Sequence, residues 1–248
     1  MSDRLGLMNP TVKYLPCGDT AVAVEFGDRV DRRLSASVVS LGKRISEARL
    51  TGLVETVPTF RSLLVHYDPL RTSASQLCAQ IDAVLEASAD QQITGRLWRI
   101  PACYEGDLSP DLRDVATRTG LSPSEVVAGH TGERYYVYML GFLPGFPYMG
   151  DLPEPLRLPR RENPRVKVPA GSVSIASNLT GVYSFESPGG WHLIGRTPIC
   201  LFESGRMPPA LMQPGDAVCF EAVSRAEFDR LSADVGKGTF VPVPEQAA

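Results

Sequence analysis

The sequence lacks the short motifs that mark the common nucleotide and nucleophile sites. It has no Gly-x-x-x-x-Gly-Lys-Ser/Thr loop for phosphates and no Gly-x-Gly-x-x-Gly turn for a dinucleotide. It also lacks the Gly-x-Ser-x-Gly elbow of the α/β-hydrolases. Its histidines, His66, His130 and His192, are far apart and have no metal-ligand spacing, so no metal site is predicted. Any catalysis therefore requires a partner, or a site that no common motif describes.

Cysteine, basic charge and long apolar runs are also sparse. The five cysteines are widely spaced and form no Cys-x-x-Cys pair, which argues against both a disulfide framework and a zinc site. The net charge is −3 and no dense Lys/Arg run occurs, so nucleic-acid binding is not expected. No apolar stretch is long enough to span a bilayer, and residues 1–10 lack the apolar core of a signal peptide. We expect a cytoplasmic protein that does not bind membranes.

The first part of the chain alternates predicted strands and helices. Residues 21–26 and 62–67 are rich in β-branched and apolar side chains, as strands are. After each, apolar residues recur every three or four positions, which predicts a helix. Asp28 or Asp31 can start the first helix and Ser73 the second. This order predicts a small α/β sandwich of the split β-α-β kind over residues 1–90.

The second part is predicted to be a β-barrel domain over residues 91–248. Residues 87–94 are small and polar, and we place the domain boundary there. Ser-Pro pairs at 109–110 and 122–123 start two short helices, the first ending at Gly120. Short strands and Gly/Pro turns then continue to about residue 222, and Ser224 starts a final helix. A closed or nearly closed barrel suits many short strands because closure removes exposed edges. The predicted fold class is therefore α+β.

The richest stretch for function is residues 141–198, where Gly and Pro separate short β-like runs. Arg165 and Arg196 lie in such turns, where rigid neighbours favour bidentate binding of a carboxylate or phosphate; bonding to loop carbonyls is the alternative. Ser172 is either a nucleophile or ligand donor, or a turn residue. Trp191 is either a substrate platform or a packing anchor. Phe142 and Phe146 either fill the barrel end or dock a partner.

His130 follows a predicted helix that ends near residue 128. It is either a general base at the mouth of the barrel or a C-terminal residue favoured by the helix dipole.

Together these segments resemble the KipI/PxpB family, also called allophanate hydrolase subunit 1. The resemblance covers nearly the whole chain and is carried by residues 17–21, 136–150, 159–160, 164–165, 168–175, 180–183 and 187–198. One departure is Leu179, at a position where the family often has Gln. Any ligand contact made by that amide in relatives is absent here.

The resemblance implies a small α/β domain before a cyclophilin-like β-barrel, and a role as a subunit of an ATP-dependent 5-oxoprolinase. Such a subunit works with a second barrel subunit of the PxpC/KipA type and a lactam-hydrolase-like subunit of the PxpA type. ATP, with Mg, is bound by the complex, which opens 5-oxo-L-proline to L-glutamate. The family also includes a regulator that inhibits a sensor histidine kinase. Related domains form part of urea carboxylase, a biotin enzyme, although this chain has no biotinyl-lysine motif.

With this function we assign roles to the candidate residues. His130 and Arg196 are predicted to be catalytic. Substrate binding is predicted for Arg165, Ser172, Thr180, Tyr183 and Trp191. Contact with a partner protein is predicted for Phe142, Phe146 and Tyr148.

Overall fold

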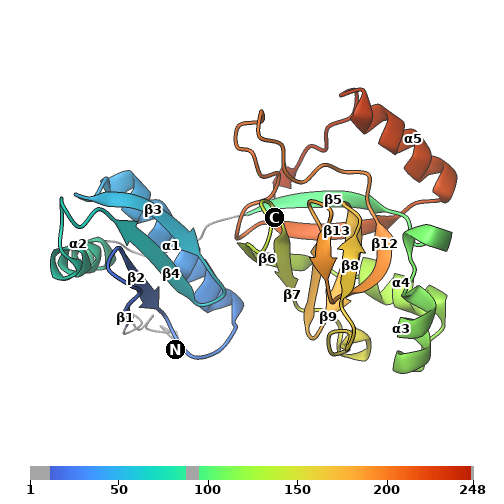
Figure 1. Ribbon diagram of the computed structural model, residues 1–248, viewed down its shortest axis with the longest axis horizontal. Coiled ribbons are helices and arrows are strands. Elements are labelled where there is room, and N and C mark those ends of the chain that lie inside the picture. The colour runs from blue at the N-terminus through green and yellow to red at the C-terminus, as the bar shows by residue number, and fades with distance from the viewer. Residues whose placement is uncertain (1–11, 88–94, 247–248) are drawn as a thin grey trace, which may run out of the picture. The chain divides into compact units, whose positions relative to one another are not determined.

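The computed structural model describes residues 12–87 and 95–246. The chain divides into two compact units, residues 1–93 and 94–248, and each is described by itself. The boundary segment predicted at 87–94 lies, apart from Ala87, outside the described residues. The predicted α+β class is confirmed: Figure 1 shows helices and strands in both units.

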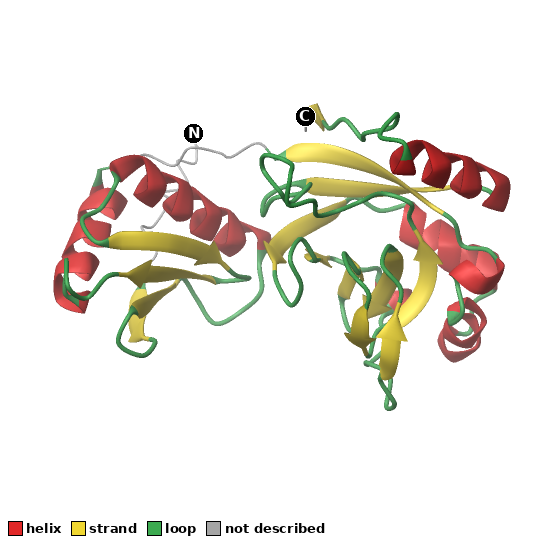
Figure 2. Ribbon diagram, turned by 45° about the horizontal axis from the view of Figure 1, so that its top comes forward, coloured by secondary structure: helices red, strands yellow, loops and turns green. Residues whose placement is uncertain are grey.

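The first unit is a four-stranded antiparallel sheet with two helices on one face. Its elements in chain order are β1 (Lys13–Pro16), β2 (Ala21–Glu25), α1 (Arg32–Ala48), β3 (Leu53–Pro58), β4 (Ser62–Tyr67) and α2 (Ala74–Glu86). The strand order is β1-β2-β4-β3, and Figure 2 shows both helices on the same side of the sheet. The two central strands and both helices were predicted from the sequence, whereas the two edge strands were missed.

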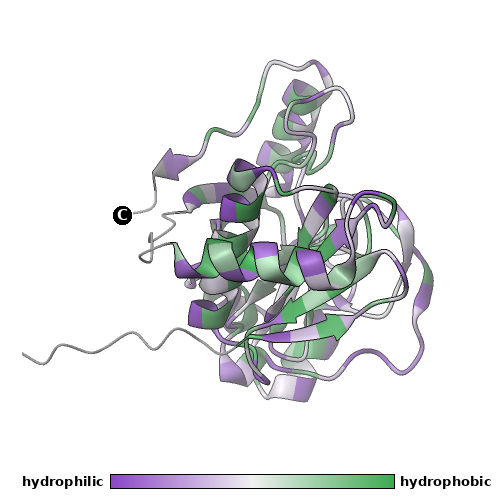
Figure 3. Ribbon diagram, turned by 90° about the vertical axis from the view of Figure 1, so that its left-hand side faces the viewer, coloured by the Kyte–Doolittle hydropathy of each residue, from purple (hydrophilic) through white to green (hydrophobic). Residues whose placement is uncertain are grey.

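The core of this unit lies between its sheet and its helices. Leu41 and Ile45 of α1, Leu77 of α2 and Leu63 of β4 are fully buried there. Asp31 begins α1 by accepting from two backbone amides, and Ser73 begins α2 with a capping box, as predicted. Figure 3 shows hydrophilic and hydrophobic residues mixed along the helices, as expected where one helix face is buried.

The second unit is built on an eight-stranded curled sheet with the order β12-β9-β10-β7-β6-β13-β5-β14. The β13–β5 pair is parallel and the other pairs are antiparallel. The strands are β5 (Arg96–Ala102), β6 (Tyr135–Leu140), β7 (Pro147–Gly150), β9 (Ser172–Ala176), β10 (Leu179–Val182), β12 (His192–Arg196), β13 (Ala217–Ala222) and β14 (Glu245–Gln246).

The curled sheet is nearly closed by one antiparallel bridge. The amides of Cys103, just after β5, and Arg196, at the end of β12, donate to each other's carbonyl oxygens at 2.8 and 2.9 Å. This bridge joins the first strand in the sheet order to the chain that leaves β5. It agrees with the predicted nearly closed barrel and fixes Arg196 at the closure.

Helices and a small β-ribbon complete the second unit. The helices are the 3₁₀ turns η1 (Gly106–Leu108) and η2 (Glu154–Leu156), with α3 (Leu112–Thr119), α4 (Pro123–Thr131) and α5 (Arg225–Gly236). The ribbon pairs β8 (Arg165–Val168) with β11 (Ser187–Gly189). Gly120 ends α3, Ser122 begins α4 with a capping box, and Ser224 begins α5, all as predicted.

The predicted start of α3 at Ser109-Pro110 is wrong. The helix begins at Leu112, with Asp111 at the N-cap but no side-chain cap bond. Ser109 instead donates its hydroxyl hydrogen to the carbonyl oxygen of Tyr104 at 2.8 Å. The carboxylate of Asp111 is withheld from capping because it holds two arginines and a strand amide, as described below.

Within the described ranges, no helix combines the length and the apolar character needed to cross a membrane.

Candidate functional site

The best-defined candidate site in the second unit is a pocket of about 240 Å³, which we call the aromatic pocket. Five aromatic residues, one arginine and the Pro/Gly turns around them form its walls. The lining residues are Phe142, Phe146, Tyr148, Arg160, Pro164, Tyr183, Pro188, Gly189, Gly190 and Trp191.

The pocket unites two groups of residues that were assigned separate roles from the sequence. Tyr183 and Trp191 are predicted substrate residues, whereas Phe142, Phe146 and Tyr148 are predicted partner contacts. The ring of Phe146 is central and packs against the other four, with centroids 5.0 to 5.7 Å away. Both groups therefore belong to one surface.

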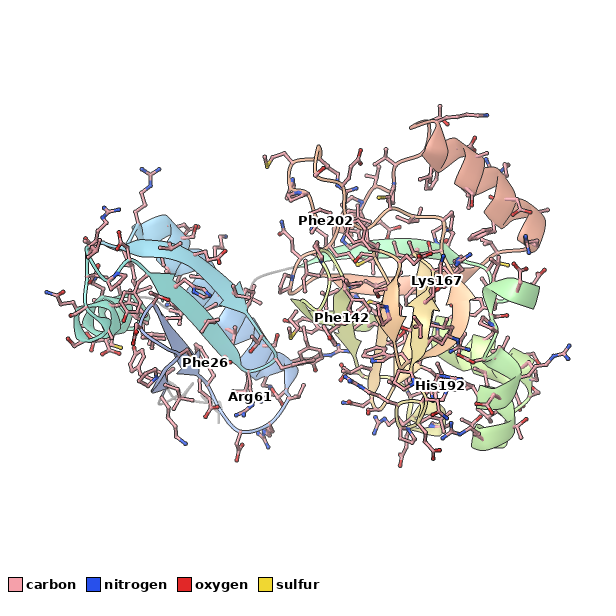
Figure 4. All side chains as sticks on the ribbon, viewed as in Figure 1. Phe26, Arg61, Phe142, Lys167, His192 and Phe202 are labelled. Carbon is pink, nitrogen blue, oxygen red and sulfur yellow. The ribbon has the colours of Figure 1, made fainter. Side chains whose placement is uncertain are left out.

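The turn before β7 holds the two phenylalanines in opposite environments. Phe146 is buried, whereas Phe142 is 61% exposed and lies at the rim. Phe142 adopts a φ of 66°, in the left-handed region that non-glycine residues occupy at a cost of about 1 kcal/mol. Figure 4 labels Phe142 and Phe202 at the same edge of this unit, and Phe202 packs on Phe185, which is 40% exposed. Aromatic side chains thus continue from the pocket onto the surface.

Polar groups in the pocket are few and are affected by burial. The pKa values of the Tyr148 and Tyr183 hydroxyls are raised because burial disfavours their ionised forms. The charge of Arg160 opposes that rise at both tyrosines. The pocket can therefore offer two neutral phenols and one guanidinium to a ligand.

Arg165 is engaged by an acidic residue that no sequence pattern singled out. Its two terminal nitrogens donate to the two carboxylate oxygens of Asp111 at 2.6 and 2.8 Å. Arg161 donates to the same carboxylate at 2.9 Å, and so does the amide of Leu193 at 2.7 Å. Asp111 is 4% exposed, so this is a partly buried ion cluster. The structure thus favours a positioning role for Arg165 over direct substrate binding.

His130 lies inside the barrel, in a chain of hydrogen bonds. Thr180 donates to the carbonyl of Ser174 at 3.0 Å, so its oxygen accepts from Nε2 of His130 at 2.9 Å. Nδ1 of His130 then accepts from the hydroxyl of Tyr104 at 2.9 Å. The histidine is fully buried, and burial lowers its pKa to about 3. It is neutral, so the helix dipole does not hold a charge here, and both ring nitrogens and the Thr180 hydroxyl are already used in packing the core.

Arg196 and Ser172 lie on the sheet face that carries the aromatic cluster. Register pairs Arg196 with Ser172, and Leu193 with Ser174, so these residues share one face. Leu193 packs with Phe146 and Trp191 on that face. The Arg196 guanidinium is half-buried, makes no hydrogen bond within the described part of the chain, and has its pKa lowered by burial. Nearby Asp107 instead pairs with Arg225 at 2.6 Å.

Two residues of this region were missed as site residues. Arg160 lines the pocket, and its only sequence signal was membership of the Pro159-Arg160 pair that contributed to the family resemblance. Asp111 gave no signal, since its partners come from segments 50 to 82 residues away. Leu179, the departure from the family pattern, packs against the aromatic cluster. Among the described residues, no group of three His, Cys, Asp or Glu could hold a metal ion.

Known proteins similar to this chain point to one family. Residues 12–212 match the family described as carboxyltransferase domain, subdomain C and D. The chain is 38% identical to the PxpB subunit of 5-oxoprolinase from Bacillus subtilis (strain 168), over 88% of this chain and 96% of that protein. It is 27% identical to urea amidolyase of Saccharomyces cerevisiae, over 96% of this chain but 15% of that protein.

A solved structure agrees with these matches. The crystal structure of TTHA0988 superimposes with a TM-score of 0.74 at 36% identity. The match covers 82% of this chain and 40% of the TTHA0988 chain, so this chain spans about two fifths of that protein. The chain belongs to the carboxyltransferase subdomain C and D family and, within it, to the KipI/PxpB proteins, which include the 5-oxoprolinase subunits of this type.

Proposed function

We propose that this protein is the PxpB-type subunit of an ATP-dependent 5-oxoprolinase. The observation that carries the proposal is its 38% identity to the corresponding 5-oxoprolinase subunit of Bacillus subtilis over 96% of that protein's length. The aromatic pocket supports it, because a pocket of about 240 Å³ suits a small ring compound. An apolar cavity of about 150 Å³ already holds benzene.

The proposed reaction needs ATP because a five-membered lactam resists hydrolysis. Transfer of a phosphoryl group to the lactam oxygen makes that oxygen a leaving group. Opening the lactam consumes one water and breaking the phosphoanhydride consumes another, giving glutamate, ADP and phosphate. Stabilising negative charge on the transferred group requires a cation that is not neutralised by a fixed partner.

Within this proposal, Arg196 is the residue of the chain that faces the phosphoryl group. Its guanidinium is half-buried, and low water content strengthens its attraction for an anion. Ser172 lies opposite it on the same face and can donate a hydrogen bond. Tyr183 and Trp191 form pocket walls for the ring. His130 and Thr180 support the barrel beneath, and Arg165 fixes the start of β8 beside the pocket.

ATP, with Mg, is proposed to bind in the assembled complex rather than in the aromatic pocket. Drug-sized ligands take pockets of about 300 to 1,000 Å³, and a nucleoside triphosphate is at least as large. The pocket volume of about 240 Å³ is smaller than that range. Dependence on ATP makes the cytoplasm the proposed location.

The proposed partners are a second barrel subunit of the PxpC/KipA type and a lactam-hydrolase-like subunit of the PxpA type. Phe142, at the pocket rim and mostly exposed, is the proposed contact with the second barrel subunit. Phe142→Ala is expected to weaken assembly about tenfold or more in a pull-down titration, since buried aromatic anchors dominate interfaces. Leu70→Ala, at another exposed apolar residue, is the matched control. Equal assembly by both variants would remove Phe142 from the interface.

The activity is tested by reconstitution. ADP release and glutamate formation are measured after adding 5-oxo-L-proline to the protein alone and to its mixture with the two proposed partners. Turnover only in the mixture is expected. An assembled mixture that releases no ADP with 5-oxo-L-proline would contradict the proposed activity.

A carboxyltransferase role is the second candidate, favoured by the match to urea amidolyase over 96% of this chain. It predicts carboxylation of urea with a separately supplied biotin carrier and no reaction with 5-oxo-L-proline. The same purified protein tests both, and the product identifies which holds.

A further inference from the structure

Arg160 is the single charged residue among the ten that line the aromatic pocket. The other nine are aromatic residues, prolines and glycines, so no carboxylate in the wall neutralises it. Its charge acts on the hydroxyls of both Tyr148 and Tyr183, which lie in the wall with it. The pocket therefore combines aromatic faces with one positive charge.

The neighbouring arginines cannot take the same role. Arg161 and Arg165 both donate to Asp111, whose two carboxylate oxygens are within 2.6 to 2.9 Å of them. In the described part of the chain, Arg160 has neither a hydrogen bond nor an ion pair through its side chain, which is exposed to solvent. Of the three, Arg160 alone is available to a ligand anion.

The size of the pocket limits the anion to a small molecule. About 240 Å³ is more than the roughly 150 Å³ that accommodates benzene, which leaves room for a ring and one substituent. Flat aromatic walls favour a compact ring, and a planar guanidinium matches a carboxylate bidentately. The complementary ligand is a small cyclic acid.

We propose that Arg160 binds the carboxylate of a small cyclic acid whose ring lies against Trp191 and Tyr183 in the aromatic pocket. Naming the ligand as 5-oxo-L-proline rests on the proposed function. Arg160 then selects for the acid over the same lactam without its carboxylate. Arg165, which the sequence favours for this contact, instead holds β8 in place through Asp111.

The test compares two ligands that differ only in the carboxylate. Binding of 5-oxo-L-proline and of pyrrolidin-2-one is measured by tryptophan fluorescence, because Trp191 is in the pocket wall and Trp98 is buried elsewhere in the barrel. The wild-type chain is expected to prefer the acid about 10- to 100-fold, the range of a charge-assisted hydrogen bond. Arg160→Gln should bind both ligands similarly, and Arg160→Lys should retain part of the preference. Arg113→Gln, at an exposed arginine of α3, should match the wild type.

The same variants in the reconstituted complex separate binding from chemistry. Arg160→Gln should raise KM for 5-oxo-L-proline about 10- to 100-fold while leaving KM for ATP unchanged. A wild-type preference retained by Arg160→Gln, or no preference for the acid by either chain or complex, would overturn the proposal. Preference through Arg160 without 5-oxoproline turnover would refute the proposed function and leave the carboxylate site standing.

Discussion

At the scale of single residues, Asp111 decides which arginines of the second unit are free. Arginines 160, 161 and 165 have the same chemistry, and all follow or precede prolines or lie one residue from one. Only the fold brings Asp111 to two of them and leaves the third at the pocket. Since the partners are 50 and 54 residues apart in sequence, spacing could not assign them.

Replacing Asp111 should therefore destabilise the second unit. Asp111→Asn removes the charge that compensates Arg161 and Arg165, and breaking a buried ion pair in this way costs about 3 kcal/mol. Chemical unfolding followed by tryptophan fluorescence measures the loss. Asp114→Asn, in an exposed pair with Arg118 at 3.9 Å, should cost under about 0.5 kcal/mol. Similar losses for both variants would mean that the Asp111 cluster contributes little.

His130 should make the stability of the second unit depend on pH. Its pKa falls from the ordinary 6.5 to about 3 on folding, so the unfolded chain binds a proton that the folded chain refuses between these values. Stability is therefore present above pH 6.5 and is lost as pH falls, by about 1.4 kcal/mol per pH unit.

The slope attributable to His130 is isolated by comparison with His130→Gln. Free energies of unfolding are measured between pH 7.5 and 5, where carboxylates add their own slopes to both proteins. The variant should be less stable at pH 7.5, because core hydrogen bonds are lost, but its slope should be shallower by about one proton. Parallel slopes would show that His130 is protonated in the folded protein.

At the scale of elements, local signals predicted helix ends well where the capping side chain had no other partner. Asp31, Ser73 and Ser122 all accept from backbone amides at the helix starts expected from sequence. The start of α3 failed because Asp111, at the N-cap, is used by distant arginines. Edge strands β1 and β3 were missed because their residues are largely exposed and show no clear alternation.

The strand β11 makes a prediction about pocket shape. A Cβ at Gly189 would lie 2.2 Å from the hydroxyl oxygen of Tyr183, so Gly189→Ala must displace that ring. A Cβ at the adjacent Gly190 would approach Pro164 only to 3.6 Å, an ordinary contact. Gly189→Ala should therefore weaken binding of 5-oxo-L-proline at least tenfold, whereas Gly190→Ala should change it less than twofold, in the fluorescence titration. Unchanged binding by Gly189→Ala would show that Tyr183 is not needed in its present position.

At the scale of the whole molecule, composition and pattern reached the α+β class and the two-part layout, because hydrophobic periodicity reports which faces are buried. The site was predicted in outline only. The rings that line the pocket come from residues 142–191, where Gly and Pro turns are dense, and they were recognised as candidates. Their meeting in one pocket depends on the β8–β11 ribbon and on register in the curled sheet, which are contacts between distant segments.

Each unit has its own hydrophobic core, which leads to a prediction about unfolding. Leu63→Ala removes a fully buried side chain from the first core and should cost that unit about 3 kcal/mol. Both tryptophans, Trp98 and Trp191, lie in the second unit, so fluorescence reports on that unit alone. The variant should therefore show an earlier transition by far-ultraviolet circular dichroism and an unchanged midpoint by fluorescence. Ile175→Ala, in the second core, should lower the fluorescence midpoint. If Leu63→Ala lowers both midpoints equally, the two cores unfold as one cooperative unit.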